Sequence, residues 1–586
     1  MLKTLFKSIR EYKLPSILTP ILVFIEVIIE CIIPMVIAEL VNRLQREDGM
    51  RIEDILVYGG IVAGLAVLSL TFGSLAGLTC STASCGFAKN LRRDMFVATQ
   101  RFSFYNIDRF STSSLVTRLT TDVSNVQHAY MMIIRTAVRS PFMFIFAIVM
   151  AFVMGGPMAW IFVVVVPILL FVLAFVIWKA MPLFRKVFKK YDKMNSSVQE
   201  NIKGIRVVKS FVRENFEEEK FGRASEEVCR DFTRAERILA IQNPAMQLCL
   251  NIVMVFVLSF GSYMIVSGGG ESLNVGHLSA LLTYGFMILS SLMMLSMIFV
   301  MLTMSAESGR RIAEVINETP AITSPENAIT EVKDGSVDFD GVFFKYSENA
   351  ERYVLSDIDL HIKSGETIGI ISGTGASKTT LIQLISRLYD VTEGSVKVGG
   401  IDVREYDLET LRNSVAVVLQ KNLLFSGTIA ENLRWGNKDA TDEELREAAR
   451  LAAADEFIES FPEGYNTYIE QGGANVSGGQ KQRLCIARAL LKRPKILILD
   501  DSTSAVDTRT DARIRAAMRE YIPDTTKIII AQRISSVEDA DRIIVLESGR
   551  ISAVGAHSEL LHTSEIYRDI YTSQNKAGTE EVKGNE

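Results

Sequence analysis

The first half of this 586-residue sequence contains six long apolar segments. Each approaches or exceeds the roughly 20 residues that a helix needs to cross a lipid bilayer. Residues 160–178 carry no charge at all, which disfavours the alternative of buried core helices in a large soluble domain. The sequence therefore predicts six transmembrane helices. They cover residues 16–41, 55–78, 136–154, 158–180, 246–266 and 278–304.

The connecting segments predict the orientation of these helices. Short polar connectors at 154–157 and 266–277 join the third to the fourth and the fifth to the sixth segment. Long charged segments at 89–127 and 184–237 are rich in Lys and Arg, and basic loops favour the cytoplasm. We expect these segments and the basic N-terminus to be cytoplasmic in a plasma-membrane protein without a cleaved signal peptide. Helical patterning through the charged segments predicts membrane helices that extend into the cytosol.

Composition narrows the class of protein further. Hydrophobic residues make up 48% of the chain and the mean hydropathy is +0.22, yet 22% of residues are charged, so part of the chain must face water. A net charge of −5 argues against a nucleic-acid partner. The six cysteines form no C-x-x-C pair and the five histidines are dispersed, which disfavours a disulfide scaffold and a zinc site.

The second half of the chain has a different pattern of predicted secondary structure. Short β-rich runs alternate with helical stretches, which is the pattern of an α/β nucleotide-binding domain. We therefore expect an all-α six-helix transmembrane domain at 1–316, a linker at 317–331, an α/β P-loop domain at 332–572 and a disordered tail at 573–586. The expected strands are 336–346, 367–371, 415–419, 496–499, 527–530 and 542–546.

A candidate phosphate-binding loop reads S-G-T-G-A-S-K-T-T between an apolar strand and a helix. In such a loop the backbone N–H groups surround the phosphates, Lys378 reaches the β- and γ-phosphates, and Thr379 ligates Mg²⁺. The loop departs from the phosphate-binding pattern at two positions, because Ser372 and Ser377 stand where glycines are expected. The predicted ATP-binding residues are Ser372, Gly373, Thr374, Gly375, Ala376, Ser377, Lys378, Thr379 and Thr380.

Further motifs follow in a fixed order. Asp500 ends an apolar strand, where it can hold Mg²⁺. The stretch N-V-S-G-G-Q-K-Q-R precedes an Ala/Leu-rich helix and resembles the signature of the ATP-binding cassette (ABC) family. The signature residues expected to bind ATP across a dimer are Val476, Ser477, Gly478, Gly479 and Gln480.

The resemblance assigns roles to more residues and covers almost the whole chain. It implies that Tyr346, in V-F-F-K-Y, stacks on adenine and that Gln420 contributes to the ATP and Mg²⁺ site. Six spans followed by one cassette look like a half-transporter of the type IV exporter fold. The segments F-Y-N-I-D-R-F at 104–110 and G-I-R-V-V-K-S-F-V-R-E-N at 204–215 then lie in the regions that carry the coupling helices.

Three positions depart from the pattern of active cassettes. Asp501 stands where the family has the general base Glu, Gln532 where it has a switch His, and Ser377 where it has Gly. Asp withdraws the carboxylate by one methylene, about 1.5 Å, and a misplacement of about 1 Å can cost roughly 10²-fold in rate. Gln can hydrogen-bond a phosphate but cannot titrate as His does. Neutral drift with activity retained is the alternative.

The resemblance implies a head-to-tail dimer in which each ATP lies between one P-loop and the other subunit's signature. This chain would supply a poor hydrolytic half-site and an intact signature. We therefore predict the degenerate-site subunit of a heterodimer, using ATP and Mg²⁺, with a second half-transporter that carries Glu and His.

The membrane half contains two candidate substrate features. Glu26 and Glu30 lie on one helix face, where each carboxylate costs about 2.5–3.5 kcal/mol on insertion scales. They attract cationic amphiphiles or pair with Arg135 or Arg139; both readings stay open. Thioether side chains along the last span are adaptable ligand contacts, or packing and lipid contacts. They are Met294, Met297, Met301 and Met304.

The expected function is ATP-driven export of hydrophobic or amphipathic, drug- or lipid-like compounds across the plasma membrane. Membrane lipid and a small amphipathic substrate are the expected partners besides the second subunit. The alternatives are a dedicated peptide or lipid exporter and a weak-ATPase membrane sensor or channel-like protein without transport.

Overall fold

The computed structural model describes residues 1–45, 51–267, 273–372 and 377–583, which form two compact units. Unit 1 consists of Met1–Arg101 and Phe110–Glu318, and unit 2 of Phe102–Arg109 and Thr319–Glu586. A short segment from the first half of the chain therefore belongs with the second half.

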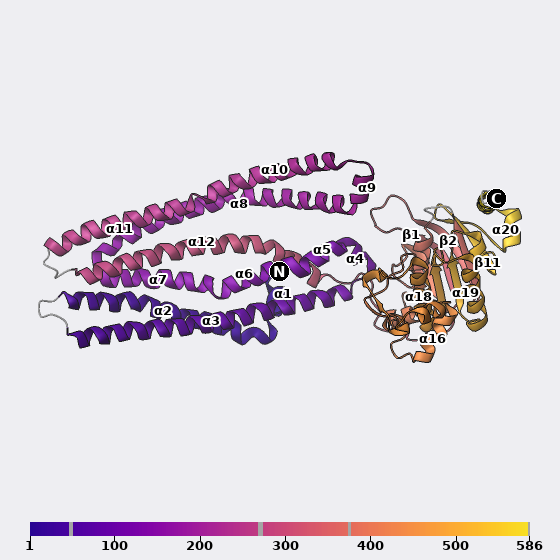
Figure 1. Cartoon of the computed structure of the whole chain (residues 1–586), viewed down its shortest axis with the longest axis horizontal. Coiled ribbons are helices and arrows are strands. Elements are labelled where there is room, and N and C mark those ends of the chain that lie inside the picture. The colour runs from indigo at the N-terminus through magenta and orange to yellow at the C-terminus, as the bar shows by residue number, and fades with distance from the viewer. Residues whose placement is uncertain (46–50, 268–272, 373–376, 584–586) are drawn as a thin grey trace. The chain divides into compact units, whose positions relative to one another are not determined.

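Unit 1 is entirely helical in its described part, and its long helices correspond to the six predicted spans (Figure 1). Five continuous helical stretches are long and apolar enough to cross a membrane, and one of them, Thr112–Phe184, contains two of the predicted spans. A 3₁₀ turn at Gly156–Ala159 separates these two, beginning at Gly156 with a φ of +49°. The long helices are α2 (Lys13–Leu44), α3 (Ile52–Gln100), α7 (Thr136–Gly155), α8 (Trp160–Lys203), α11 (Gln242–Ser267) and α12 (Val275–Asn317).

Several of these helices are much longer than a bilayer is thick. At about 1.5 Å per residue, the 49 residues of α3 extend about 74 Å. This length is what helices that continue beyond the membrane require. The other α-helices described in unit 1 are α1 (Leu2–Lys7), α5 (Thr112–Thr117), α6 (Val123–Ile134), α9 (Ile205–Ser210) and α10 (Glu214–Leu239).

Helices α2 and α12 approach each other closely at Gly276. Its backbone N–H donates to Asn42 Oδ1 at 2.8 Å, and a Cβ on Gly276 would lie 2.0 Å from the carbonyl oxygen of Ala38. Further along, the hydroxyl of buried Tyr284 donates to the carbonyl of Cys31 at 2.8 Å. A glycine and two polar contacts thus hold these apolar helices together.

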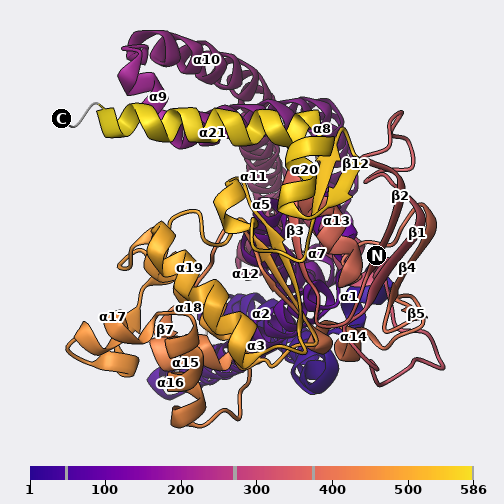
Figure 2. The ribbon, with the colours of Figure 1, turned by 90° about the vertical axis from the view of Figure 1, so that its right-hand side faces the viewer.

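Unit 2 contains two main sheets (Figure 2). The antiparallel sheet has the order β2-β1-β4-β5, and the larger sheet has the order β12-β11-β3-β10-β9-β6, in which only β12 is antiparallel to its neighbour. The first contains β1 (Val337–Phe344), β2 (Leu355–Ile362), β4 (Glu393–Val398) and β5 (Ile401–Asp402). The second contains β3 (Thr367–Ser372), β6 (Val415–Val418), β9 (Ile496–Asp500), β10 (Thr526–Ile530), β11 (Arg542–Glu547) and β12 (Arg550–Gly555). The six predicted strands are thereby confirmed as β1, β3, β6, β9, β10 and β11.

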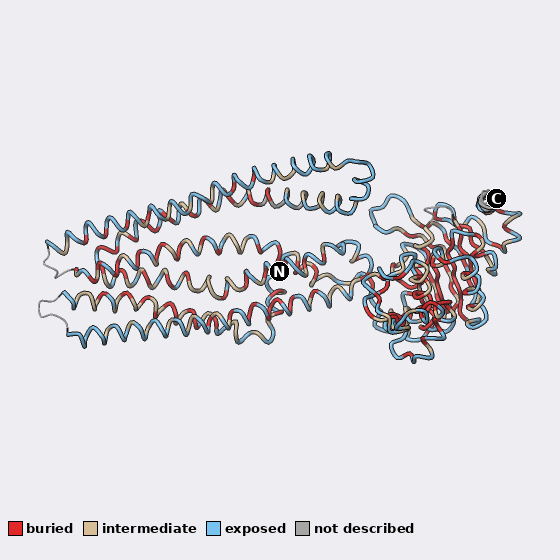
Figure 3. The backbone as a smooth tube through the Cα atoms, in the orientation of Figure 1, coloured by how far each residue is buried: buried red, intermediate tan, exposed pale blue. Residues whose placement is uncertain are grey.

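The larger sheet is buried on both faces (Figure 3). One face shares a hydrophobic core with the antiparallel sheet and α13, and the other packs against helices including α16 and α18. Continuous apolar strands are typical of such doubly covered parallel sheets. The α-helices described after Thr319 in this unit are α13 (Lys378–Ile385), α14 (Leu408–Ser414), α15 (Ile429–Arg434), α16 (Asp442–Leu451), α17 (Asp455–Ser460), α18 (Gly478–Leu491), α19 (Thr508–Tyr521), α20 (His557–Thr563) and α21 (Glu565–Lys583). A small ribbon pairs β7 (Gly427–Thr428) with β8 (Tyr468–Ile469).

The C-terminal segment differs from its prediction. The sequence predicts disorder from Ser573, but α21 continues through that residue to Lys583. Tyr567 is fully buried and hydrogen-bonded to His557 at 2.7 Å, and Ile570 and Tyr571 pack against the same core. The first part of α21 therefore docks on the domain through an apolar face, and the helix continues from there into the polar segment.

Replacing Gly276 by Ala tests the contact between α2 and α12. The added methyl group would collide with backbone, so we expect a loss of about 1–3 kcal/mol in stability, visible as a lower melting temperature in detergent. Gly64→Ala is the matched control, since no atom lies within 4 Å of the Cβ it would add. A Gly276→Ala protein that melts with the wild type would contradict the close approach.

Candidate active site

The candidate site lies at the carboxyl ends of parallel strands in the six-stranded sheet. Ile530 at the end of β10 pairs with Ile370 of β3 on one side and with Asp500 of β9 on the other. The segments that follow these three strands therefore leave the sheet side by side. Ligands of open α/β sheets bind at this edge.

The phosphate-binding loop is described at its two ends. Gly373, Thr374, Gly375 and Ala376, which are predicted to surround the phosphates, lie outside the described residues. Ser377 directly precedes α13 with a φ of +62°, a left-handed conformation that favours glycine. The Ser at this position therefore carries backbone strain that the family's Gly would avoid.

Lys378 begins α13 and is about half-buried in this loop. Its Nζ donates to the carbonyl of Ser372 at 3.3 Å. Burial lowers the pKa of the Lys378 ammonium, and the charges of Asp501 and Asp500 partly oppose that effect. An ammonium group removed from water in this way is poised to interact with phosphate oxygens.

Thr379 and Asp500 meet at the start of α13. The Thr379 hydroxyl donates to Asp500 Oδ2 at 2.8 Å, and Asp500 is only 4% exposed. Burial raises the pKa of the Asp500 carboxyl, opposed by the Thr379 hydrogen bond and the Lys378 charge. A hydroxyl and a carboxylate are the hard oxygen donors that Mg²⁺ prefers, so this pair fits the predicted ion. When bound, Mg²⁺ would neutralise phosphate charge there.

Asp501 is the point where the two predicted glutamines converge. Its Oδ2 accepts hydrogen bonds from Gln532 Nε2 at 2.7 Å and from Gln420 Nε2 at 3.3 Å. Gln532 and Asp501 are therefore neighbours in the structure. Gln420 was predicted to act on Mg²⁺ with Thr379 and Asp500, but its amide nitrogen is turned to Asp501 instead, and a role as a ligand stays a prediction.

Sequence reasoning missed Gln574. Its Nε2 donates to the backbone carbonyl of Gln532 at 2.8 Å, and its Oε1 accepts from the backbone N–H of Ile534 at 2.9 Å. Helix α21 thereby contacts both ends of Gln532–Ile534, which we call the switch segment. The motif pattern contains no signal for this contact, because Gln574 lies in the tail that composition predicts to be disordered.

The signature segment is well formed. Ser477 caps α18 in a capping box with Gln480, which satisfies backbone donors at the helix start. A Cβ on Gly479 would lie 2.8 Å from the carbonyl oxygen of Ala505, so glycine allows the backbone at Ala505 to pack closely. Val476 is buried, and Gly478 lies beside the Ala505 side chain. The intact packing agrees with a functional signature.

Tyr346 presents an exposed ring beside α13. Its hydroxyl is hydrogen-bonded to Thr380 Oγ1 at 2.9 Å, and its ring contacts the edges of Phe344 and Tyr389. The residue is 41% exposed, so a ring surface is available for a base. Stacking on adenine stays a prediction.

The predicted coupling segment around residue 106 packs against the same aromatic group. The Tyr389 hydroxyl donates to Asp108 Oδ2 at 2.7 Å, and the Asn106 amide donates to the carbonyl of Thr319 at 3.1 Å. Both contacts lie within unit 2. Tyr389 therefore joins the segment Phe102–Arg109 to the ring of Tyr346.

In the membrane unit, Glu26 and Glu30 both pair with Arg139 of α7. Arg139 Nη1 lies 2.5 Å from Glu26 Oε1, and Nη2 lies 2.7 Å from Glu30 Oε2. The guanidinium of Arg135, the other predicted partner, lies beside Gly77 of α3. Of the two interpretations left open by the sequence, the ion pair with Arg139 is present.

A cavity of about 540 Å³ opens beside this ion triad, between α2, α7 and α12. Glu30, Arg139 and Met294 line it. Met297 and Met304 are exposed and Met301 is half-buried, and none of the three is among the lining residues described. Only the first of the four predicted methionines therefore lines this cavity.

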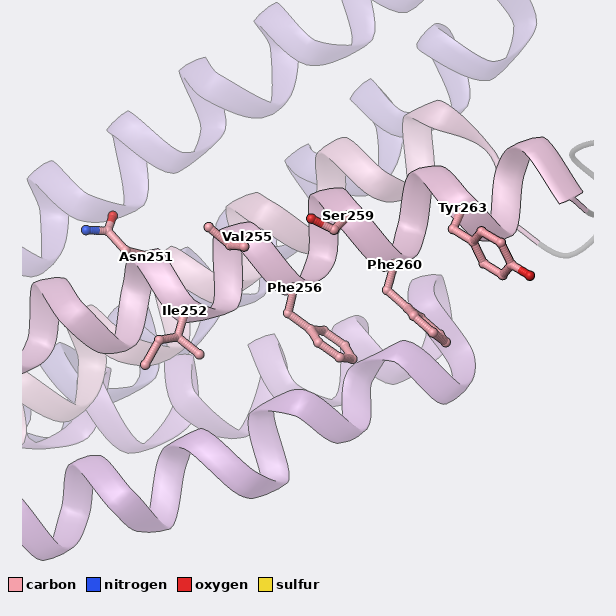
Figure 4. A pocket seen from close by; sticks show the side chains of 7 residues that line it. All are labelled: Asn251, Ile252, Val255, Phe256, Ser259, Phe260 and Tyr263. Carbon is pink, nitrogen blue, oxygen red and sulfur yellow. The ribbon is translucent and has the colours of Figure 1, made fainter.

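A second hollow of about 660 Å³ follows one face of α11 (Figure 4). Phe256 and Phe260 are stacked there with ring centroids 5.5 Å apart, and Tyr263 continues the row. Its described lining contains no charged side chain. Such an open apolar face suits contact with lipid chains or with another apolar helix.

Known proteins share these features. The family model for the ABC transporter transmembrane region matches residues 16–305, and the model for the ABC transporter domain matches residues 355–504. The chain is 36% identical over 569 residues to the uncharacterized ABC transporter ATP-binding protein YfiB of Bacillus subtilis, covering 97% of both. A fatty acid ABC transporter ATP-binding/permease protein of Mycobacterium bovis is 33% identical over 477 residues, which cover 81% of this chain and 75% of that protein.

A solved structure supports the fold. A bacterial Atm1-family ABC exporter with ATP bound superposes with a TM-score of 0.82 at 24% identity, covering 96% of this chain and 98% of that one. With a helical transmembrane region followed by an ATP-binding domain whose ATPase activity is coupled to transport, the chain belongs to the ABC transporter family.

Proposed function

We propose that this chain is the degenerate-site subunit of a heterodimeric exporter in the plasma membrane. Its partner would be a second half-transporter with Glu at the position of Asp501 and the switch His at the position of Gln532. The observation that carries this proposal is the Asp501 carboxylate, whose Oδ2 is shared by the amides of Gln420 and Gln532.

A general base needs a carboxylate oxygen within hydrogen-bond reach of the attacking water. Asp501 carries its carboxylate one methylene closer to the backbone than Glu would. Two amide N–H groups also occupy lone pairs of Oδ2, which leaves fewer acceptor positions of this carboxylate for a water molecule. The glutamine amide cannot take up a proton near neutral pH, as the usual His can. Both changes oppose hydrolysis.

The described residues expected to hold nucleotide at this site, by contrast, are retained. Lys378 is partly desolvated and Thr379 contacts Asp500, while the intact signature, capped by Ser477, would serve the ATP bound at the partner's P-loop. We expect such a site to bind ATP and to hydrolyse it slowly. A ligand shifts a conformational equilibrium through its differential affinity for two states, so retained ATP still favours closure of the cassettes without being hydrolysed. Hydrolysis at the partner's Walker site would then reset the pair.

For the cargo we propose hydrophobic or amphipathic, drug- or lipid-like compounds. The support is the cavity beside the ion triad, which combines charged, hydroxyl and apolar side chains. From the name of the related fatty acid transporters we carry over an apolar chain as a feature of the cargo, and not the acidic group.

The first prediction concerns which site turns over. In the assembled transporter, Asp501→Asn should leave the ATPase rate nearly unchanged, because this carboxylate contributes little to hydrolysis. Changing the partner's catalytic Glu to Gln should abolish it. Vanadate trapping of a photoreactive ATP analogue locates the hydrolysed nucleotide at the partner's Walker site. Brisk ATPase by this chain alone, lost in Asp501→Asn, would refute the proposal.

The second prediction is a gain of activity. Asp501→Glu combined with Gln532→His should raise hydrolysis at this site by at least about tenfold, since a placed general base contributes about 10²–10⁴-fold. Single-turnover ATP hydrolysis by the assembled transporter with an inactivated partner site is the measurement. Asp524→Glu, at an exposed turn away from the site, is the matched control. An unchanged rate in the double variant would show that the two replaced positions do not limit hydrolysis.

A further inference from the structure

We infer that the cavity between α2, α7 and α12 binds an amphiphile with a single positive charge, which enters against Glu30. This inference rests on the proposed export function and names the charge of its cargo. The evidence for it is the ratio of carboxylates to guanidinium groups beside the cavity.

Two carboxylates share one guanidinium group. Glu26 and Glu30 both contact Arg139, so the triad carries one negative charge in excess when all three groups are ionised. Arg135 does not correct this balance at the cavity, because it lies beside Gly77 and is not among the lining residues. Glu30 and Arg139 are the only charged side chains in the described lining. An uncompensated carboxylate within an apolar bundle is costly, and a cationic ligand removes that cost.

The geometry of the triad also separates its members. Arg139 directs Nη1 to Glu26 and Nη2 to both oxygens of Glu30. A carboxylate offers about four acceptor sites, so Glu30 retains acceptor capacity on the side that lines the cavity. An anionic ligand could reach the N–H groups of Arg139 that the two carboxylates do not use, but the excess negative charge of the triad would repel it. The cavity is therefore built to accept a donor or cation.

Glu26 is the buried carboxylate of the triad. It is 6% exposed, and its Oε2 has no hydrogen-bond partner among the described residues. A Cβ on Gly73 of α3 would lie 2.9 Å from Glu26 Oε1, so glycine leaves the space that this carboxylate occupies. A buried carboxylate with an unused oxygen keeps the negative charge close to the cavity.

The rest of the lining accommodates an apolar body. Phe286, Met287 and Met294 of α12 provide an aromatic ring and two flexible thioethers. Thr136 and Ser140 of α7 add hydroxyl groups near the charged end. Met side chains adapt to ligands of varied shape, and aromatic rings attract cations. The chemistry as a whole suits one cationic group attached to a bulky apolar skeleton.

Tetraphenylphosphonium and tetraphenylborate test this inference directly, because the two ions match in shape and differ in the sign of the charge. Saturable binding of each ion to the full-length chain is measured without nucleotide in dodecyl maltoside, a detergent with neither charge nor amine. We expect the cation to bind at least about tenfold more tightly than the anion, a difference of about 1.4 kcal/mol.

The variant Glu30→Gln should weaken binding of tetraphenylphosphonium by at least about tenfold and leave the anion unaffected. Glu39→Gln is the matched control, since Glu39 lies on the same helix, is partly exposed and pairs with Arg43 rather than lining the cavity. If Glu30→Gln does not fold, the comparison of the two ions on the wild-type chain still decides.

Equal affinity for both ions, or full cation binding in a folded Glu30→Gln protein, would overturn the inference. The assay contains no ATP, so its result is separate from that of the trapping experiment. Cation binding without transport would leave this site standing and contradict the export function. Trapping at the partner's site without cation selectivity would support the proposed export function and contradict the cation site.

Discussion

The parallel pairing of β3, β10 and β9 is the constraint on which the nucleotide site depends. It brings the end of the phosphate-binding strand, the two aspartates and the switch segment to one edge of a sheet that is buried on both faces. The backbone there cannot adjust easily. The Asp501 N–H donates to the carbonyl of Ile530 at 2.9 Å, and Asp501 has a φ of +49°. A fixed backbone means that one missing methylene is not recovered by a small movement of the chain, so side-chain length at this position sets the reach of the carboxylate.

Much of this arrangement is predictable because it follows from strong local signals. Uninterrupted apolar runs identify the membrane helices and the central strands, and the glycine-rich loop and signature locate the nucleotide-binding elements. The antiparallel strands β2 and β4 were missed. They alternate buried and exposed residues and lie among turns, so their hydrophobic signal is weaker than that of the central strands.

The remaining details depend on contacts between residues far apart in sequence. Arg135 and Arg139 lie one helical turn apart, and only the packing of α7 against α2 selects Arg139 as the partner of Glu26 and Glu30. Similarly, no motif indicates that Gln574 reaches the switch segment, because the docking of α21 through Tyr567 brings it there. Local patterns predict elements and candidate residues, whereas the choice among equivalent partners is made by the tertiary fold.

The two functional regions differ in the balance of hydrogen-bond donors and acceptors around their carboxylates. At Asp501, two amide donors meet on one oxygen, so the carboxylate is held in place and has less capacity for water. At Arg139, two carboxylates share one guanidinium, so acceptor capacity and negative charge remain beside a cavity. A surplus of donors favours a static site that retains its ligand without chemistry. A surplus of acceptors leaves a position for a donor that the protein itself does not supply, and a cationic cargo of the kind we infer would supply it.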